Sequence, residues 1–377
     1  MAQAEGAAST VVAVHDCLPA VSRIFKAGTN GVLVVWRRLV ILDDPWQQTV
    51  TTARRLHETD NRAGRRKFSF MQRVAYSCCY THLPRLWAAF SQPFAFWVFR
   101  MKLQASCSLT ATAYSDCPVI AMLRPRSGAA QTVQHDRYAL QPALPMTEYV
   151  DNFGNLCQRF VVPQGEFQLQ VAVVMTVERH IDIAPQAPRT PVEQLPHEVL
   201  AYLLQSRYCP SDKMDEQARN IAGHALPGYD QAEQIRAWVH AMLIYQYGVS
   251  TAITDALDTL NQGAGVCRDF AHVGIALCRS LQIPARFVVG YLHGLQPMDL
   301  HAWFEAFVGG RWYTFDATQD TPRGGRVVLA YGRDAADVAF LSDYGAQPLQ
   351  INQMQVDVQE LLKTNSTVID TSLTLHF

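Results

Sequence analysis

The 377-residue chain lacks the features that define several common protein classes. Its longest apolar run, residues 86–99, contains Pro93 and falls short of the roughly twenty residues that a membrane-spanning helix needs. Its nine cysteines include no CxxC pair and no repeated zinc-type spacing. A P-loop, a dinucleotide-binding glycine pattern and a paired-carboxylate motif are also missing. We therefore expect no membrane span, no metal and no cofactor.

The chain also has little net charge. Its formal charge of -1 predicts no electrostatic attraction to nucleic acid or to anionic membranes. Its 49% hydrophobic and 17% charged residues are typical of a globular protein rather than a disordered one. The first ten residues lack the basic start of a signal peptide, and the odd, scattered cysteines suit free thiols in a reducing compartment. We predict a cytoplasmic protein, and no feature of the sequence specifies its oligomeric state.

The first hundred residues differ in kind from the rest of the chain. They carry about seven net positive charges, whereas the remainder carries about eight net negative ones. They hold four tryptophans in no periodic pattern and no recognisable motif. We interpret residues 1–100 as a poorly patterned extension, with Met101 as a candidate for the natural start.

Regular patterns begin at Met101. Alternating or β-branched apolar runs separated by turn-forming groups predict strands at residues 103–114, 117–125, 138–144, 155–163 and 167–178. Short strands at this spacing indicate a β-sandwich domain over residues 101–182. A polar, proline-bearing stretch follows, and residues 183–224 are expected to form a linker and a helical connection, with a helix at residues 196–208.

The next region mixes helices and strands. Helical spacing of apolar residues predicts a helix over residues 231–247 and another after Gly265. Strands are expected at residues 285–291, 301–308 and 311–316, so residues 225–345 form an α+β domain. Residues 346–377 are interpreted as a carboxy-terminal strand region and tail, with a strand at residues 350–361 that packs against one of the two domains.

A glycine-flanked cysteine occurs in the segment GAGVCRDFAH, residues 263–272. The apolar spacing after it places Cys267 in the first turn of a helix. Free N–H groups and the positive end of the helix macrodipole favour a thiolate there and can receive an oxyanion. A lone cysteine is more often a buried core residue, so this segment by itself leaves both interpretations open.

A second segment, HAWFEAFVGGRWYTFDAT, begins at His301 and predicts a β-hairpin whose two-residue loop is residues 309–310. With that loop, Val308 lies opposite Arg311. His301 and Asp316 then become diagonal neighbours on one face, about 7–8 Å apart at the backbone. A slip of one residue would move Asp316 to the other face, so the register is a falsifiable prediction.

This hairpin brings an imidazole and a carboxylate together for use by a thiol. His301 would take the proton of Cys267 and later protonate the leaving amine, while Asp316 would fix the imidazole tautomer and stabilise the imidazolium. Taken singly, His301 is more often a half-buried, hydrogen-bonded histidine, and Asp316 a turn former at a strand end. With the upstream cysteine, the combination favours a catalytic triad.

Other residues near these segments fit packing or loop roles better, or leave a choice open. Cys278, Trp303 and Trp312 are interpreted as packing residues, and His272 as a packing or helix-surface residue. His293 and Asp299, at the ends of the loop before His301, could line a cleft or be solvated. Zinc binding by Cys267 with nearby histidines lacks an HxxxH-type pair. Tyr245, Tyr247 and Gln262 each qualify as a second oxyanion donor, and the sequence does not choose among them.

The segments GVCRDFAH, HAWFEAF and WYTFDAT follow the order of the Cys, His and Asp motifs of the transglutaminase-like superfamily, which the chain resembles over residues 225–345. LRPRSGAAQ and YVDNFGNLCQRFVVPQGEF resemble the amino-terminal region of bacterial members, and the resemblance does not reach residues 1–100. It implies an α+β, papain-like transglutaminase core preceded by a β-sandwich. It also implies that Cys267, His301 and Asp316 are the catalytic residues.

We therefore expect acyl transfer by a cysteine nucleophile, through a thioester, on peptide or glutamine-type amides of a peptide or protein substrate. The resemblance to bacterial members favours hydrolysis, as by a peptidase or amidase, over crosslinking to an amine. Two other hypotheses remain. The chain could be a binding or scaffold protein that keeps the fold without turnover, or Cys267 could be a regulatory thiol, although Cys278 is badly placed to resolve it.

Overall fold

The computed structural model describes residues 24–26, 32–34 and 100–361 of the chain. The chain divides into two units, residues 1–92 and residues 93–377. In the first unit, strand β1 (Ile24–Lys26) pairs with strand β2 (Val32–Val34) in an antiparallel arrangement. The rest of the predicted extension up to residue 99 lies outside the described residues.

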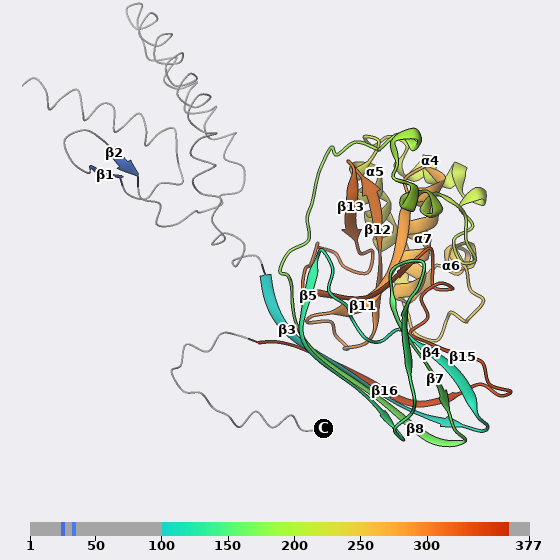
Figure 1. The fold of residues 1–377 in the computed structure, drawn as a ribbon. Helices are drawn as coiled ribbons and strands as arrows, with labels where there is room; N and C mark the ends of the chain where they lie inside the picture. The colour runs from blue at the N-terminus through green and yellow to red at the C-terminus, as the bar shows by residue number, and fades with distance from the viewer. Residues whose placement is uncertain (1–23, 27–31, 35–99, 362–377) are drawn as a thin grey trace, which may run out of the picture. The chain divides into compact units, whose positions relative to one another are not determined.

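The second unit begins with a β domain of two four-stranded antiparallel sheets (Figure 1). One sheet has the order β16-β3-β8-β5, with bounds Gln350–Glu360, Arg100–Ala113, Gly165–Glu178 and Gln131–Gln141. The other has the order β15-β4-β7-β6, with bounds Leu341–Asp343, Cys117–Ala121, Leu156–Val162 and Thr147–Val150. Strand β6 was not predicted from the sequence, because its four residues are all exposed and carry no apolar alternation.

Alternation of apolar and polar residues explains this domain. In β3 the odd-numbered residues from Met101 to Ala113 are buried, while the even-numbered ones are partly or fully exposed. The long strand β8 shows the same period and pairs with β3 along its whole length, from Arg100 opposite Glu178 to Ala113 opposite Gly165. Each sheet therefore turns one apolar face inward and one polar face outward, as antiparallel sheets commonly do.

The carboxy-terminal strands complete the β domain. Strand β16 pairs with β3, so that Val356 lies opposite Cys107, and strand β15 pairs with β4. The chain thus leaves the β domain after β8 and returns to it at its end. The expected strand at residues 350–361 corresponds to β16.

Between β8 and the next regular helix the chain is mostly irregular. It forms the short 3₁₀ helices η1 (Val192–Gln194), η2 (His197–Leu203) and η3 (Ser211–Lys213). The predicted helix at residues 196–208 is therefore only a 3₁₀ helix that ends at Leu203, where the following Leu204 has an extended backbone. Helix α4 (Asp215–Ala222) then follows, in the region expected to be a helical connection.

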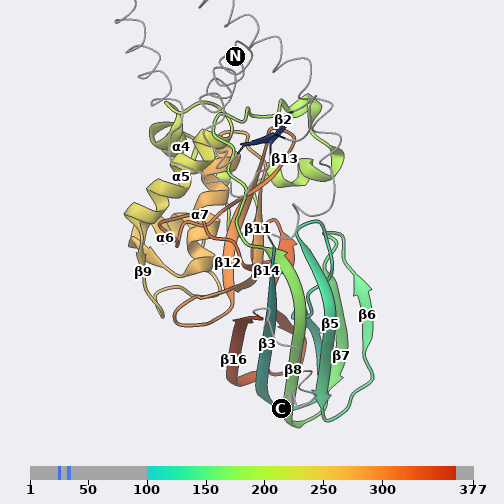
Figure 2. The ribbon, with the colours of Figure 1, turned by 90° about the vertical axis from the view of Figure 1, so that its left-hand side faces the viewer.

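The α+β part contains α5 (Tyr229–Met242), α6 (Ala256–Gln262) and α7 (Cys267–Ser280). Its antiparallel sheet has the order β13-β12-β11-β14, with bounds Arg311–Phe315, His301–Val308, Ala285–Leu292 and Arg326–Gly332. Figure 2 shows α5, α6 and α7 on one side of this sheet. The mixed α+β fold preceded by a β domain confirms the predicted fold class.

Helix α7 lies directly against β12. A Cβ atom added at Gly274 would come within 2.4 Å of the Phe304 ring, so only glycine allows this close approach. The predicted helix at residues 231–247 ends earlier, at Met242. The chain then extends into strand β9 (Ile244–Tyr245), which pairs in parallel with β10 (Ala264–Gly265), immediately before Cys267. Among the helices of the described residues, none is long and apolar enough to cross a membrane.

Candidate active site

Cys267 is the first residue of α7, as the sequence predicts. Val266 before it has an extended backbone, and its N–H donates to Asp269 Oδ2 at 2.9 Å. Since valine carries no side-chain acceptor, only this half of a capping box is present, and the N–H groups of the first turn receive no cap from a side chain. Of the six cysteines in the described residues, all free, Cys267 alone is not buried.

Two glycines before Cys267 fix the approach of the chain. Gly263 ends α6 with φ at +69°, in the left-handed region that glycine adopts at little cost. A Cβ atom at Gly265 would lie 2.7 Å from the Asp269 Cβ, so the second glycine leaves space for that fully buried carboxylate. Asp269 Oδ1 in turn accepts hydrogen bonds from Arg268 at 3.1 and 3.0 Å. These contacts hold the turn that leads into α7, and therefore the position of the Cys267 side chain, in one conformation.

The hairpin of β12 and β13 has the predicted register. Val308 lies opposite Arg311, and Phe304 lies opposite Phe315. Asp316 follows the last residue of β13, which puts it diagonally across from His301 at the start of β12. The two glycines of the loop, at residues 309–310, have φ values of +57° and +82°, as this tight turn requires.

His301 and Asp316 make a direct, buried contact. The distance from His301 Nε2 to Asp316 Oδ2 is 2.8 Å, and the two residues are only 2% and 4% exposed. Because an ionised carboxylate can only accept, Nε2 carries the proton and donates it to Asp316. This hydrogen bond leaves Nδ1 of the ring for another partner.

The Cys267 thiol supplies a further contact to this imidazole. Burial alone would lower the pKa of His301, but the charge and hydrogen bond of Asp316 raise it, and a hydrogen bond and the charge of Cys267 add to the rise. The resulting pKa of His301 is about 9. The three predicted residues are thus brought together in the order thiol, imidazole, carboxylate.

Asp316 is held by more groups than the sequence indicated. Its Oδ1 accepts hydrogen bonds from the Thr318 backbone N–H at 3.0 Å and from the Thr318 hydroxyl at 2.7 Å. Arg326 Nη2 lies 2.9 Å from Oδ2, in an ion pair whose angle is not that of a directed hydrogen bond. Although burial raises the pKa of Asp316, the charges of His301 and Arg326 and these hydrogen bonds hold it well below its ordinary value. The carboxylate is therefore ionised in the folded protein.

Sequence reasoning missed both Thr318 and Arg326 as neighbours of Asp316. Thr318 had a local signal, since an Asp-x-Thr sequence at a strand end favours turns in which the hydroxyl bonds the carboxylate. Arg326 begins the apolar run RVVLAYG after two glycines, which is a recognisable strand pattern. Its pairing with Asp316 depends on tertiary structure.

One of the three candidate oxyanion donors lies at the nucleophile. The Tyr245 hydroxyl contacts the backbone N–H of Cys267 and the Tyr247 hydroxyl. Burial, then the charge of Cys267, raise the pKa of Tyr245, so the hydroxyl keeps its proton. The Gln262 amide instead donates to the carbonyl of Ala264 at 2.7 Å. Pairing of β9 with β10 explains the difference, since it places Tyr245 opposite Gly265.

The other residues weighed from the sequence lie in packing or loop positions. His272 is fully buried, its ring stacks on Tyr208 at 5.1 Å, and its Nε2 accepts from the Ala335 N–H at 3.2 Å. Burial lowers the pKa of His272 to about 3, so its ring is neutral. Cys278 is fully buried as well, and burial raises its pKa. Trp303 is buried with its ring 6.1 Å from that of His301.

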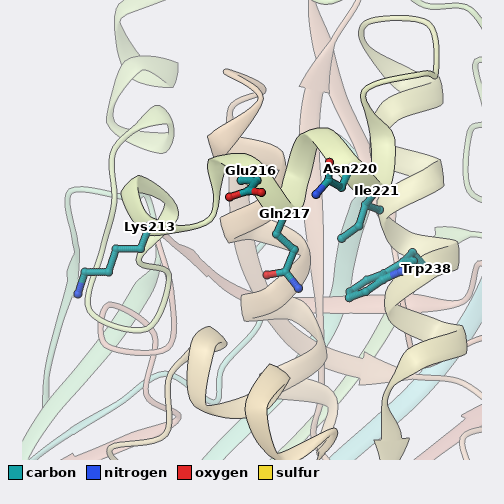
Figure 3. Close-up of a pocket in the computed structure, with 6 residues that line it drawn as sticks. All are labelled: Lys213, Glu216, Gln217, Asn220, Ile221 and Trp238. Carbon is teal, nitrogen blue, oxygen red and sulfur yellow. The ribbon is translucent and has the colours of Figure 1, made fainter.

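Outside the group of Cys267, His301 and Asp316, the described residues include a pocket but no metal-binding cluster. The described residues contain no cluster of three or more His, Cys, Asp or Glu side chains suited to hold a metal ion. A pocket of about 550 Å³ lies between η3, α4 and α5 (Figure 3). Its lining consists of Lys213, Glu216, Gln217, Asn220, Ile221 and Trp238. This lining includes none of Cys267, His301 and Asp316.

Comparison with known proteins gives a family match for each of the two parts of the second unit. Residues 215–317 match the family model of the transglutaminase-like superfamily, and residues 111–178 match that of the bacterial transglutaminase-like N-terminal region. The uncharacterized protein ML0607 of Mycobacterium leprae is 30% identical over 250 residues, which are 61% of this chain and 88% of that protein.

A solved structure is also similar over most of its length. It is the crystal structure of a presumed cysteine protease from Cytophaga hutchinsonii, with 33% identity and a TM-score of 0.66. The match covers 71% of this chain and 93% of the other. Since both relatives are matched over nearly their whole length at 30% identity or more, the chain belongs to the transglutaminase-like superfamily.

Proposed function

We propose that the chain is a cysteine peptidase or amidase in which Cys267 is the nucleophile, His301 the general acid and base, and Asp316 the group that orients His301. One observation carries this proposal. A partly exposed thiol at a helix start interacts with an imidazole whose Nε2 is held at 2.8 Å by a buried, ionised carboxylate. That arrangement supplies every proton transfer that acyl transfer to a thiol needs.

The reaction would proceed in two halves. The Cys267 sulfur attacks the amide carbonyl carbon, a C–S bond forms, and the carbonyl oxygen becomes an oxyanion. Collapse of this intermediate breaks the C–N bond, and His301 gives its proton to the leaving amine. Water then attacks the thioester while His301 accepts one of its protons, and the carboxylic acid leaves as the Cys267 sulfur is released.

The oxyanion would be bound by the backbone N–H of Cys267 and the hydroxyl of Tyr245. Both groups lie at the start of α7, where the macrodipole favours a negative charge. In the structure the Tyr245 hydroxyl oxygen accepts from the backbone N–H of Cys267. A substrate oxygen that took this place would receive hydrogen bonds from both donors.

Hydrolysis is favoured over amine transfer by the similarity to a presumed cysteine protease. The second candidate function, crosslinking of a glutamine-type amide to an amine, uses the same thioester and differs only in the acceptor. The substrate in either case would be a peptide or protein, and cytoplasmic location stays a prediction. A binding protein without turnover is the alternative from another class, and it requires an unreactive Cys267.

Thiol labelling separates the enzyme from the binding protein. At neutral pH, iodoacetamide should modify Cys267 far faster than the eight other cysteines, and peptide mass mapping identifies the labelled site. His301→Ala should slow this labelling at least tenfold, because the imidazole no longer takes the thiol proton. Slow and uniform labelling of all cysteines in the folded protein would rule out the enzymatic proposal.

The acceptor is decided by a second experiment. A peptide library incubated with the protein should yield shortened or deamidated peptides in water alone, and Cys267→Ala should yield none. Addition of a primary amine distinguishes the two acceptors, since a crosslinking enzyme would attach the amine in preference to water. Mass spectrometry of the products reads out both outcomes.

A further inference from the structure

The edge strand of the α+β sheet is completed by side chains rather than by another strand. Among the described residues this sheet has the order β13-β12-β11-β14, so β14 pairs with a strand on one side only. On its other side the amide of Gln131 accepts from the Val328 N–H and donates to the Val328 carbonyl, both at 2.8 Å. The amide of Asn155 does the same for Tyr331, at 2.7 and 2.8 Å. Each amide thus replaces the backbone of a missing neighbouring strand.

Both amides come from the β domain and are themselves held in place. Gln131 is the first residue of β5, is 6% exposed, and donates its other N–H to the Arg126 carbonyl at 2.8 Å. Asn155 precedes β7, is 2% exposed, and donates to Asp151 Oδ2 at 2.9 Å. Buried amides with every group satisfied are rigid, and losing one would leave backbone groups of β14 without partners.

The β domain also holds the chain just before β14. The Gly325 N–H donates to the Glu178 carbonyl at 2.9 Å. A Cβ atom at Gly324 would come within 2.2 Å of the Arg179 carbonyl oxygen, so the two segments are in close backbone contact. Together with Gln131 and Asn155, this contact fixes β14 at its start, middle and end.

Strand β14 in turn leads to the catalytic carboxylate. Its first residue, Arg326, is 8% exposed and makes the 2.9 Å ion pair with Asp316. The Arg326 guanidinium lies 4.8 Å from the Trp303 ring centre, and the side chain of Val328 is in one buried cluster with Trp303. The Trp303 ring is 6.1 Å from that of His301. Val328, which Gln131 holds by two hydrogen bonds, therefore packs against Trp303, the same ring that the Arg326 guanidinium contacts.

We infer that Gln131 and Asn155 are positioning residues of the catalytic centre, which act through β14 and Arg326 on the Asp316–His301 pair. The β domain accordingly contributes to the geometry of the active site, because its two amides hold β14. The inference rests on the proposed function, because it assigns these amides a role in the reactivity of Cys267. The charged and titratable groups that face His301 are Asp316 after β13 and Cys267 on α7, with Arg326 of β14 behind Asp316.

The test is a double variant, Gln131→Met with Asn155→Leu, which removes both amides at similar volume. The matched control is Gln158→Met, because Gln158 is also a fully buried amide of the β domain but donates to Glu148 within that domain, at 3.0 Å. The measurement is the rate of Cys267 alkylation by iodoacetamide across the pH range. Circular dichroism in the near and far ultraviolet verifies the fold of each variant.

Loss of the amides should loosen Asp316 from His301 and weaken the stabilisation of the imidazolium. The acid limb of the alkylation profile should then move upward by about one pH unit, so that the rate near pH 6 falls roughly tenfold. The control should stay within about twofold of wild type across the range. If the double variant does not fold, Gln131→Met alone should move the acid limb in the same direction by a smaller amount.

A folded variant with the wild-type pH profile would show that the amides are only structural and would overturn the inference. Failure of the proposed function would look different, because Cys267 of the wild type would then react no faster than the other cysteines. In that event the NMR titration of the His301 ring still tests the inference. Its pKa should fall in the double variant and remain unchanged in Gln158→Met.

Discussion

Strands β3 and β12 belong to the same chain but bury their side chains in different ways. Strand β3, in the β domain, alternates buried apolar residues with partly exposed polar ones such as Ser106 and Ser108. Strand β12, in the α+β sheet, is buried at all eight positions, including His301 and Glu305. A polar residue in β3 is solvated, whereas one in β12 requires a partner within the protein.

This difference decides which polar residues need a partner within the protein. In β12 each buried polar side chain has a charged partner, Asp316 for His301 and Arg286 for Glu305. In the β domain the buried amides are those of Gln131, Asn155 and Gln158. The first two bind the α+β sheet, whereas Gln158 donates to Glu148 of its own domain. A buried polar side chain therefore has to be read together with its partner, which lies in another strand or in the other sheet for His301, Glu305, Gln131 and Asn155.

The largest expected effect is on turnover. Asp316→Asn should lower the rate of peptide hydrolysis by about 10³-fold or more, because a neutral amide cannot stabilise the imidazolium and permits the wrong tautomer. Ser108→Ala, at a half-exposed position of β3, should stay within about twofold of wild type. The rates are measured on a peptide identified by library cleavage. Activity of Asp316→Asn above a tenth of wild type would contradict the assigned role.

A second effect should appear in stability. Arg286 binds Glu305 Oε2 at 2.8 and 2.6 Å, and its guanidinium lies 4.2 Å from the Trp312 ring and 3.9 Å from the Tyr331 ring. Arg286→Met would leave the carboxylate of Glu305 buried without its partner. We expect the free energy of unfolding to fall by about 3 kcal/mol, as measured by urea denaturation. A change below about 1 kcal/mol would show that this pair is effectively solvated.

The pH dependence of stability should carry a contribution from His301. Its pKa in the folded protein, about 9, is above the ordinary value of 6.5. The stabilisation is therefore fully present below about pH 6.5 and is lost as the pH rises through 9. Between about pH 7 and 9.5 the free energy of unfolding should fall by on the order of 2 kcal/mol. In His301→Gln this part of the decline should disappear, and an equal decline in both proteins would assign it to other groups.

The smallest expected effect is on the free energy of unfolding when a partly exposed ion pair of the β domain is removed. Arg124 binds Asp136 and Glu148, each at 2.6 Å, but the three side chains are 25% to 34% exposed. Arg124→Met should therefore lower the free energy of unfolding by about 1 kcal/mol or less. Urea denaturation beside Arg286→Met provides the comparison. Equal losses in the two variants would remove the distinction between the two sheets.

Much of the site could be predicted because its signals are local. The loop at residues 309–310 sets the pairing of Val308 with Arg311, and the period of two then carries His301 and Asp316 to neighbouring positions. The helix start at Cys267 follows from the glycines before it and the apolar spacing after it. These patterns span fewer than about twenty residues, which is the range over which periodicity and turn chemistry act.

Errors arose where partners far apart in the sequence decide the structure. The predicted helix over residues 231–247 ends at Met242, because Ile244 and Gln246 donate to the carbonyls of Gly263 and Gly265 instead. Strand β14 was not predicted, and its role depends on contacts with β11 and with the β domain.

The sequence by itself determined that Cys267 begins a helix and that His301 and Asp316 are neighbours in a hairpin, since the helix start and the hairpin are local structures. The tertiary structure alone decided that Tyr245, rather than Tyr247 or Gln262, lies at the Cys267 N–H, and that Arg326 stands behind Asp316. The tertiary structure also decided that Gln131 and Asn155 form hydrogen bonds with the backbone of β14, at sequence separations of 197 and 176 residues. Contacts at such separation follow from the packing of whole sheets, for which short-range patterns hold no information.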